Sequence, residues 1–170
     1  TNDQRYLAAL KAMGHKNEWK PLYRVHHADD ISIAYSYLFT STTRRNLVDL
    51  QPTKDWLDKH LMKANEWNGK GVESSQPTLW WWCDALFMAP PVIAYYVELT
   101  GEDEYLEPMH RYYKETYDLL FDQEEKLFAR DLRYVWKGNA DDRKEKNGNK
   151  VFWSRGNGWV LGGLALMLEH

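Results

Sequence analysis

The sequence has one cysteine among its 170 residues, Cys83, so a disulfide within the chain is excluded. Histidine and cysteine do not recur at the spacing of a zinc finger. No apolar run approaches the roughly 20 residues that span a bilayer, so no membrane partner is expected. Charge of one sign is not in large excess, because 22 basic residues stand against 25 acidic ones. A general nucleic-acid binder needs a basic excess or stripe, so this class is excluded as well.

Aromatic side chains are abundant, with nine Trp, eleven Tyr and five Phe making up 15% of the chain. The hydrophobic fraction of 44% and the charged fraction of 28% are typical of a folded globular protein. Part of the aromatic content belongs to the core, where such side chains contribute the largest burial energies. The remainder exceeds what a small core needs. Carbohydrate sites use aromatic faces in this way, which favours a sugar-binding function.

Apolar periodicity predicts an all-α fold of six helices with a short strand-containing insertion. The helices are expected at Gln4–Met13, from about Ala28, at residues 52–67, at residues 78–99 with a kink at Pro90 and Pro91, at residues 102–120, and from Gly156 onward. Gly14 and Gly101 are expected to end the first and fourth helices. Two strands are expected at residues 126–131 and 150–153. Both ends of the chain break off abruptly, so residues 1–170 are interpreted as one partial domain, truncated at one or both ends.

Chargeable residues gather beside aromatic or apolar ones at three places, each at the start of a predicted helix. These clusters are residues 26–30, 80–84 and 153–159. Helices joined by short connections pack antiparallel, so the second, fourth and sixth helices are expected to run parallel. Their first turns would then lie at one rim of the helical array, which is where we expect the functional site.

Asp84 is the sharpest candidate, because three tryptophans precede it and an apolar run follows it. Burial in such surroundings raises the pKa of a carboxyl group toward the range of a general acid. A nearby helix N-terminus acts in the opposite direction and favours the anion. The alternative is a helix N-cap. With a helix start predicted near Thr78, Asp84 lies about one turn too deep to cap it, so the functional interpretation is favoured.

The first cluster admits two interpretations. Asp29 and Asp30 suit the first turn of any helix, where acidic residues complement the dipole. A second carboxylate facing Asp84 would instead form the pair that glycosidases use, with one member protonated and one charged. His26 and His27 could join Asp29 as metal ligands. Adjacent histidines rarely converge on one ion, however, so no metal site is predicted.

Positive charge accompanies the third cluster. Arg155 and Trp159 are four residues apart and share one face of the predicted helix. A guanidinium beside an aromatic face suits a ligand that carries both a carboxylate and a ring. The alternative is an arginine stacked on a core tryptophan. Arg130 could add further positive charge or be an ordinary surface residue.

Two long motifs, residues 82–91 and 151–160, resemble the unsaturated glucuronyl and rhamnogalacturonyl hydrolases of glycoside hydrolase families 88 and 105. Residues 26–30 and 127–131 fit the same register, and family 105 is the closer resemblance. The similarity extends over most of the chain from about Arg24 onward. It implies about half of an (α/α)6 toroid with a short β-hairpin-like insertion, and an active site at the mouth where the inner helices begin.

The resemblance further implies a hydrolase that releases 4,5-unsaturated galacturonate from the non-reducing end of unsaturated rhamnogalacturonan oligosaccharides. Asp84 would protonate C4 of the vinyl ether and then take a proton from the water that attacks C5. Asp30 would be the second catalytic carboxylate, holding sugar hydroxyls or the water. The substrate-binding residues implied are Trp82, Arg155, Trp159, Arg130, His27 and Asp29. Neither a metal nor an organic cofactor is required for this reaction.

Three alternatives stay open at this point. One is an unsaturated glucuronyl hydrolase acting on glycosaminoglycan disaccharides. Another is a different toroid enzyme, such as a sugar epimerase or an inverting glycosidase. The third is a non-catalytic carbohydrate-binding helical domain. The family resemblance suggests the bacterial cytoplasm or periplasm, and a partial toroid is expected to expose apolar surface that favours self-association.

Overall fold

The structure is a computed structural model that describes residues 4–22, 24, 27–43, 47–62 and 78–170. These ranges are mostly helical, with one small two-stranded sheet. The helices are α1 (Gln4–Lys16), α2 (Asp29–Thr43), α3 (Gln51–His60), α4 (Ala85–Met88), α5 (Pro90–Thr100), α6 (Leu106–Leu120) and α7 (Ser154–Met167). Short 3-10 turns are η3 (Asp103–Tyr105) and η4 (Leu132–Tyr134), and the strands are β1 (Phe121–Asp122) and β2 (Leu127–Phe128).

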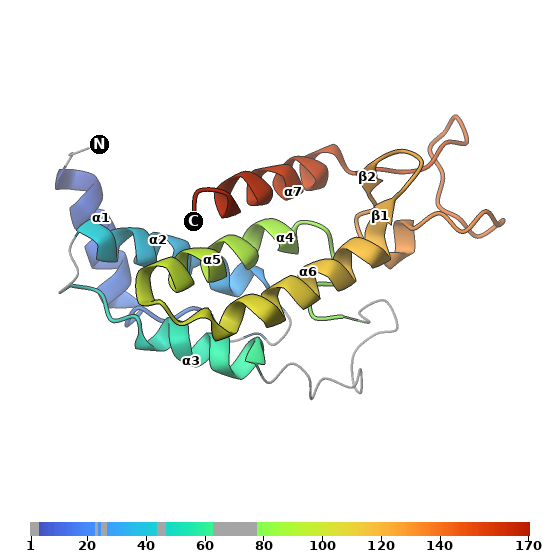
Figure 1. Ribbon diagram of the computed structural model, residues 1–170. Helices are drawn as coiled ribbons and strands as arrows, with labels where there is room; N and C mark the ends of the chain where they lie inside the picture. Colours follow the sequence, from blue (N-terminus) through green and yellow to red (C-terminus); the bar gives the residue numbers. More distant parts are fainter. Residues whose placement is uncertain (1–3, 23, 25–26, 44–46, 63–77) are drawn as a thin grey trace.

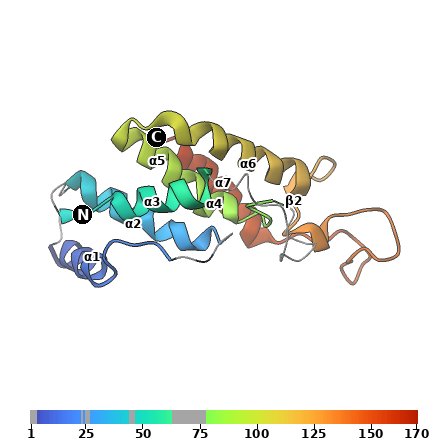
Figure 2. The ribbon, with the colours of Figure 1, turned by 90° about the horizontal axis from the view of Figure 1, so that it is seen from below.

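Helix α5 lies at the centre of the array and packs against α2, α6 and α7 (Figures 1 and 2). Its sequence is apolar nearly all round, and Val92, Ile93 and Tyr96 are buried. A helix with no polar face is stable only when neighbours cover it on all sides. Gly101 ends α5 in the left-handed conformation, as predicted, and its N–H donates to the carbonyl of Val97.

Helices α2, α5 and α7 run in the same direction, and α6 runs opposite to them (Figure 1). The first turns of α2, α4 and α7 point toward the end of the molecule that carries the β1–β2 hairpin. The parallel arrangement of alternate helices predicted from the sequence is therefore present. It places the three chargeable clusters on one side of the array.

The predicted end of the first helix at Gly14 is wrong, because α1 continues to Lys16. Gly14 is instead the place where the ring of Trp19 packs against the helix, and a Cβ there would lie 2.0 Å from a ring carbon. The turn comes later, at Glu18 and Trp19, which both have positive φ angles.

The single kinked helix predicted for residues 78–99 is also wrong. Residues 78–84 form turns, α4 begins at Ala85, and α5 starts afresh at Pro90 in the first-turn position that suits proline. The turns arise from a tertiary contact, since the N–H of Cys83 donates to the carbonyl of Arg130 at 2.9 Å. Asp84 consequently occupies the N-cap position of α4.

Of the two strands expected, at residues 126–131 and 150–153, only the first is found, as β2. Strand β2 pairs with β1, with Phe121 opposite Phe128, across a tight turn that contains Lys126 at positive φ. Residues 151–153 belong to no strand, although the backbone of Trp153 is extended and Lys150 forms an isolated bridge with Lys144. The fifth helix begins as the 3-10 turn η3, and α3 ends at His60, while residues 63–67 of the predicted third helix lie outside the described residues.

No helix in the described ranges is both long enough and apolar enough to cross a membrane. Exposed leucines line one side of α7 and its end, at Leu161, Leu164 and Leu168. Leu161 is 70% exposed and Leu164 is 40% exposed. Self-association through this surface stays a prediction.

We expect Gly163→Ala to destabilise the complete protein by about 1–3 kcal/mol, because a Cβ there would meet backbone that cannot move aside. The added atom would lie 2.5 Å from the carbonyl oxygen of Leu86. Gly158→Ala is the matched control on the same helix, since its Cβ would have no neighbour within 4 Å. The control should gain roughly 0.5–1 kcal/mol from helix propensity. Thermal unfolding measures both, and equal midpoints for the two variants would contradict the close packing of α7.

Candidate active site

The three clusters meet in a pocket of about 230 Å³. It lies where α2 and α4 begin, beside the segment that follows β2 and the residue that precedes α7. The side chains and backbone that line it belong to His27, Asp29, Trp81, Trp82, Asp84, Arg130, Asp131 and Trp153. Five of the predicted site residues are in this set, whereas Asp30, Arg155 and Trp159 are not.

Asp84 stands at the N-cap position of α4, yet its side chain makes no capping hydrogen bond. The carboxyl group therefore remains available to the pocket. The pKa of Asp84 is raised from its ordinary value near 3.8 to about 6, chiefly by burial and in smaller part by the neighbouring Asp29 carboxylate. The positive charges of Arg130 and Arg155 oppose this rise. An acid with such a pKa is partly protonated near neutral pH, as a proton donor must be.

Asp29 lines the pocket with Asp84 and Asp131, whereas the expected Asp30 does not. Asp30 is 2% exposed and accepts hydrogen bonds from the backbone N–H of Arg24 at 2.7 Å and from its guanidinium. Successive residues of a helix point about 100° apart, so only one of the two aspartates can face the pocket. The pairing with Arg24 directs Asp30 to the other side. His26 of the same cluster lies outside the described residues.

His27 lies against Trp82, with ring centroids 5.3 Å apart. Its Nδ1 atom is buried and has no hydrogen-bond partner among the described residues. A buried ring nitrogen without a hydrogen-bond partner destabilises the folded protein, and a polar ligand bound in the pocket could supply the missing hydrogen bond. Within the same described ranges, no three His, Cys, Asp or Glu side chains are placed to hold a metal ion.

The segment that carries Arg130 is fixed by its backbone and by Asp131. Trp82 and Asp131 form an isolated antiparallel bridge next to the Cys83–Arg130 hydrogen bond. Asp131 is fully buried and accepts two hydrogen bonds from the guanidinium of Arg133, at 2.9 and 2.8 Å. Burial alone would raise the pKa of Asp131, but the hydrogen bonds and charge of Arg133 hold it below its usual value. Asp131 is therefore an anchor for the wall of the pocket.

Arg155 stacks on Trp153 rather than on the expected Trp159. The guanidinium carbon lies 4.7 Å from the Trp153 ring centroid, and Trp159 packs on Phe87 at 4.6 Å. Arg130 approaches the same Trp153 ring at 5.8 Å. Two arginines therefore flank one tryptophan at the edge of the pocket. Such a pair attracts an anionic ligand and offers it a ring to stack on.

Sequence reasoning missed the roles of Asn157 and Gly156. Asn157 Oδ1 accepts the N–H of Phe128 at 2.8 Å, and its Nδ2 donates to the carbonyl of Phe128 at 3.0 Å. These bonds join the first turn of α7 to β2. A Cβ on Gly156 would lie 2.4 Å from the Trp153 ring and 2.9 Å from the Cys83 sulfur. Both residues stand inside the motif at residues 151–160, which was the available signal.

Comparison with known proteins identifies the family to which this chain belongs. The profile of Glycosyl Hydrolase Family 88 matches residues 1–170, the whole chain. The chain belongs to this family. The resemblance to unsaturated uronyl hydrolases seen in the two long motifs is thereby confirmed.

Two curated relatives of this family 88 chain are named unsaturated 3S-rhamnoglycuronyl hydrolase. The protein from Formosa agariphila is 54% identical over 173 residues, which cover 99% of this chain and 46% of that protein. The protein from an Alteromonas species is 34% identical over 182 residues, covering 100% of this chain and 43% of the relative. The chain therefore spans a little under half the length of the curated relatives it matches.

Solved structures confirm the fold as about half of a helical toroid. A structure named Polysaccharide Lyase BACCELL_00875 matches with a TM-score of 0.81 and 26% identity, over 99% of this chain and 48% of that one. A glycosyl hydrolase family 88 structure from Bacteroides vulgatus also has a TM-score of 0.81, at 24% identity, over 99% of this chain and 49% of its own.

We expect the electrostatics of the pocket to be visible in the titration of Asp84. The pKa of this carboxyl should fall in Asp29→Asn, which removes a neighbouring negative charge, and rise in Arg130→Met, which removes a positive one. Carboxyl-carbon NMR titration of the complete protein measures both shifts. The control is Arg143→Met, whose guanidinium packs on Tyr134 and which should leave the Asp84 pKa unchanged. Shifts of the opposite sign would contradict the described geometry.

Proposed function

We propose that the protein containing this chain hydrolyses the bond between a terminal 4,5-unsaturated uronic acid and rhamnose in oligosaccharides that lyases leave behind. The observation that carries the proposal is the half-buried carboxyl of Asp84, with its pKa near 6, in a pocket beside two arginines. Relatives named as rhamnoglycuronyl hydrolases support rhamnose as the adjoining sugar. Unsaturated galacturonate joined to rhamnose, as in rhamnogalacturonan fragments, is the substrate we favour.

The proposed reaction adds water across the double bond of the vinyl ether. Protonated Asp84 donates its proton to C4, and the positive charge that develops at C5 is stabilised by the ring oxygen. A water molecule then attacks C5 and returns a proton to the Asp84 carboxylate. The resulting hemiketal opens and releases the remaining sugar chain. Asp84 ends the cycle protonated, so one carboxyl serves both steps and no cofactor is consumed.

The other pocket residues divide the work of holding the substrate. We assign the second-carboxylate role to Asp29, which faces the pocket and is placed to hold the attacking water or a sugar hydroxyl. Arg155 supplies positive charge for the uronate carboxylate, with Trp153 as the adjoining ring. Asp30 acts through structure, because its pairing with Arg24 fixes the start of α2.

Arg130 and Trp82 complete the pocket in this proposal. We assign Arg130, which lines the pocket beside Asp84, to the leaving sugar. Trp82 is 9% exposed and packs edge-on against Trp81 at 4.5 Å. Together with His27, these rings cover part of the surroundings of Asp84 and reduce its contact with water. Exclusion of water strengthens the electrostatic interactions within the site.

We expect Asp84→Asn to lower the turnover of unsaturated rhamnogalacturonan disaccharide by ~10²–10⁴-fold, the usual contribution of a general acid–base group. The assay follows the loss of ultraviolet absorbance of the C4–C5 double bond by the complete protein. In the wild type, kcat/KM should fall as the pH rises above about 6, because Asp84 then loses the proton that it must donate. Retention of activity in Asp84→Asn would overturn the proposal.

The control for this variant is its stability. The folded state binds a proton on Asp84 more tightly than the unfolded state does, so this group's contribution to stability falls as the pH rises from near 3.8 through about 6. Asp84→Asn removes this cost and should be at least as stable as the wild type at neutral pH. Thermal unfolding across pH values measures the difference.

The same assay separates the alternatives. If the protein prefers an unsaturated chondroitin disaccharide to the rhamnogalacturonan disaccharide, the sugar next to the unsaturated uronate in its substrate is an amino sugar and not rhamnose. Sugar binding that persists in Asp84→Asn, with no turnover in the wild type, would indicate a non-catalytic binding domain. A rise in absorbance on an intact polysaccharide would indicate a lyase, since lyases create the double bond that these hydrolases consume.

A further inference from the structure

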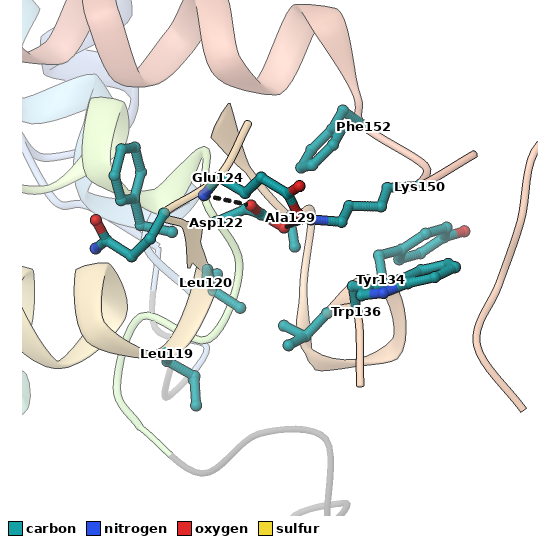
Figure 3. A pocket seen from close by; sticks show the side chains of 12 residues that line it. Leu119, Leu120, Asp122, Glu124, Ala129, Tyr134, Trp136, Lys150 and Phe152 are labelled. Atoms are coloured by element: carbon teal, nitrogen blue, oxygen red, sulfur yellow. Dashed lines mark hydrogen bonds and ion pairs between the residues drawn. The ribbon is translucent and has the colours of Figure 1, made fainter. Parts of the chain in front are cut away.

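A second groove lies on the far side of the wall that bounds the Asp84 pocket. It consists of two adjoining hollows of about 320 Å³ and about 490 Å³. The residues that line both hollows are Glu124, Trp136, Lys150 and Phe152. Figure 3 shows Lys150 reaching toward Asp122 and Glu124, between Phe152 and the rings of Tyr134 and Trp136. We call this surface the Trp136 groove.

The wall between the groove and the Asp84 pocket is made by residues 129–130 and 152–153, in which adjacent residues line opposite cavities. Ala129 and Phe152 line the Trp136 groove, whereas Arg130 and Trp153 line the Asp84 pocket. Alternation of this kind is the normal consequence of extended backbone. The Trp136 groove and the Asp84 pocket are therefore neighbours with a shared wall.

Arg130 and Tyr134 are in contact across the boundary between the Asp84 pocket and the Trp136 groove. The guanidinium carbon of Arg130, a residue of the Asp84 pocket, lies 5.9 Å from the ring centroid of Tyr134, a residue of the Trp136 groove. The Asp84 pocket and the Trp136 groove therefore meet at the contact between Arg130 and Tyr134.

Aromatic rings give the groove its apolar faces. Trp136 is half-buried, and the ammonium of Lys144 lies 5.5 Å from its ring centroid. Tyr134 is held in the same way by Arg143, at 4.8 Å from its ring and through a hydrogen bond to its hydroxyl. Cations packed on these rings restrict their motion. Rigid aromatic rings bordering an open groove suit the C–H faces of a sugar.

The centre of the groove is polar and carries a net negative charge. Lys150 Nζ lies 2.8 Å from Asp122 Oδ2 and 2.8 Å from Glu124 Oε2, and the lysine side chain is 15% exposed. An ammonium has three donors, so one remains for a ligand hydroxyl. Glu125 lines the outer hollow as a third carboxylate. Three carboxylates stand against two ammonium groups, those of Lys150 and of Lys144 on Trp136. The remaining net negative charge disfavours a uronate or a sulfate and makes a neutral sugar the matching ligand.

We propose that the Trp136 groove binds a neutral sugar unit on the leaving-group side of the oligosaccharide whose unsaturated end occupies the Asp84 pocket. The inference rests on the proposed function and names a further subsite for it. Substrates longer than a disaccharide would cross Arg130 and Tyr134 and then stack a neutral unit, such as rhamnose, on Trp136.

The test compares unsaturated rhamnogalacturonan disaccharide and tetrasaccharide as substrates of the complete protein. Trp136→Ala should raise the KM for the tetrasaccharide by about five- to tenfold, the usual worth of one aromatic contact. Its kcat, and both constants for the disaccharide, should stay unchanged. Trp136→Phe should restore part of the tetrasaccharide affinity. Tyr6→Ala is the matched control, because Tyr6 is an exposed aromatic on α1 and should alter neither substrate's constants.

A binding measurement keeps this inference separate from the proposed reaction. Calorimetry of tetrasaccharide binding should show weaker affinity in Asp84→Asn/Trp136→Ala than in Asp84→Asn alone. Equal affinities would overturn the groove as a subsite, even when Asp84→Asn has abolished turnover. An equal loss on both substrates in Trp136→Ala, with no recovery in Trp136→Phe, would also overturn it, because Trp136 would then act only through folding.

Discussion

The contact between α7 and the start of α4 is the constraint on which the rest of the site depends. Gly163 faces the carbonyl oxygen of Leu86, and Gly156 faces the sulfur of Cys83, with no side chain of their own in between. The first turn of α7 can therefore lie directly against the segment that carries Asp84. This approach brings the charge of Arg155 within reach of that carboxyl and places the ring of Trp153 at its edge.

Charge is compensated unevenly around this contact. Asp30 and Asp131 are both buried, and each is bound by the guanidinium of a nearby arginine. Buried carboxylates with such partners hold the backbone in place. Asp84 has no equivalent hydrogen-bonded partner, so burial acts on it with less opposition. The fold thus pairs its structural acids with arginines and leaves Asp84 as the acid whose pKa lies near 6.

Local pattern predicted the parallel helices and the gathering of the three clusters, because both follow from helix periodicity and short connections. The start of α4 could not be predicted in this way, since it depends on a bridge between Trp82 and the distant Asp131. Asp29 and Asp30 are adjacent, and which of them faces the pocket is decided by the hydrogen bonds of Asp30 with Arg24, which lies outside the helix. The contact of Arg155 with Trp153 could not be predicted, because it depends on Trp159 packing against Phe87 instead. Each of these errors arises from a tertiary contact, which the periodicity of the sequence cannot predict.

The shared wall at residues 129–130 and 152–153 has a consequence for how related enzymes could diverge. Because Ala129 and Phe152 line one cavity while Arg130 and Trp153 line the other, inserting or deleting one residue in either segment would exchange these assignments. The guanidinium of Arg130 would then leave the Asp84 pocket, or Phe152 would replace Trp153 there. Changes of sequence length here would therefore switch recognition abruptly, whereas substitutions would adjust each cavity separately.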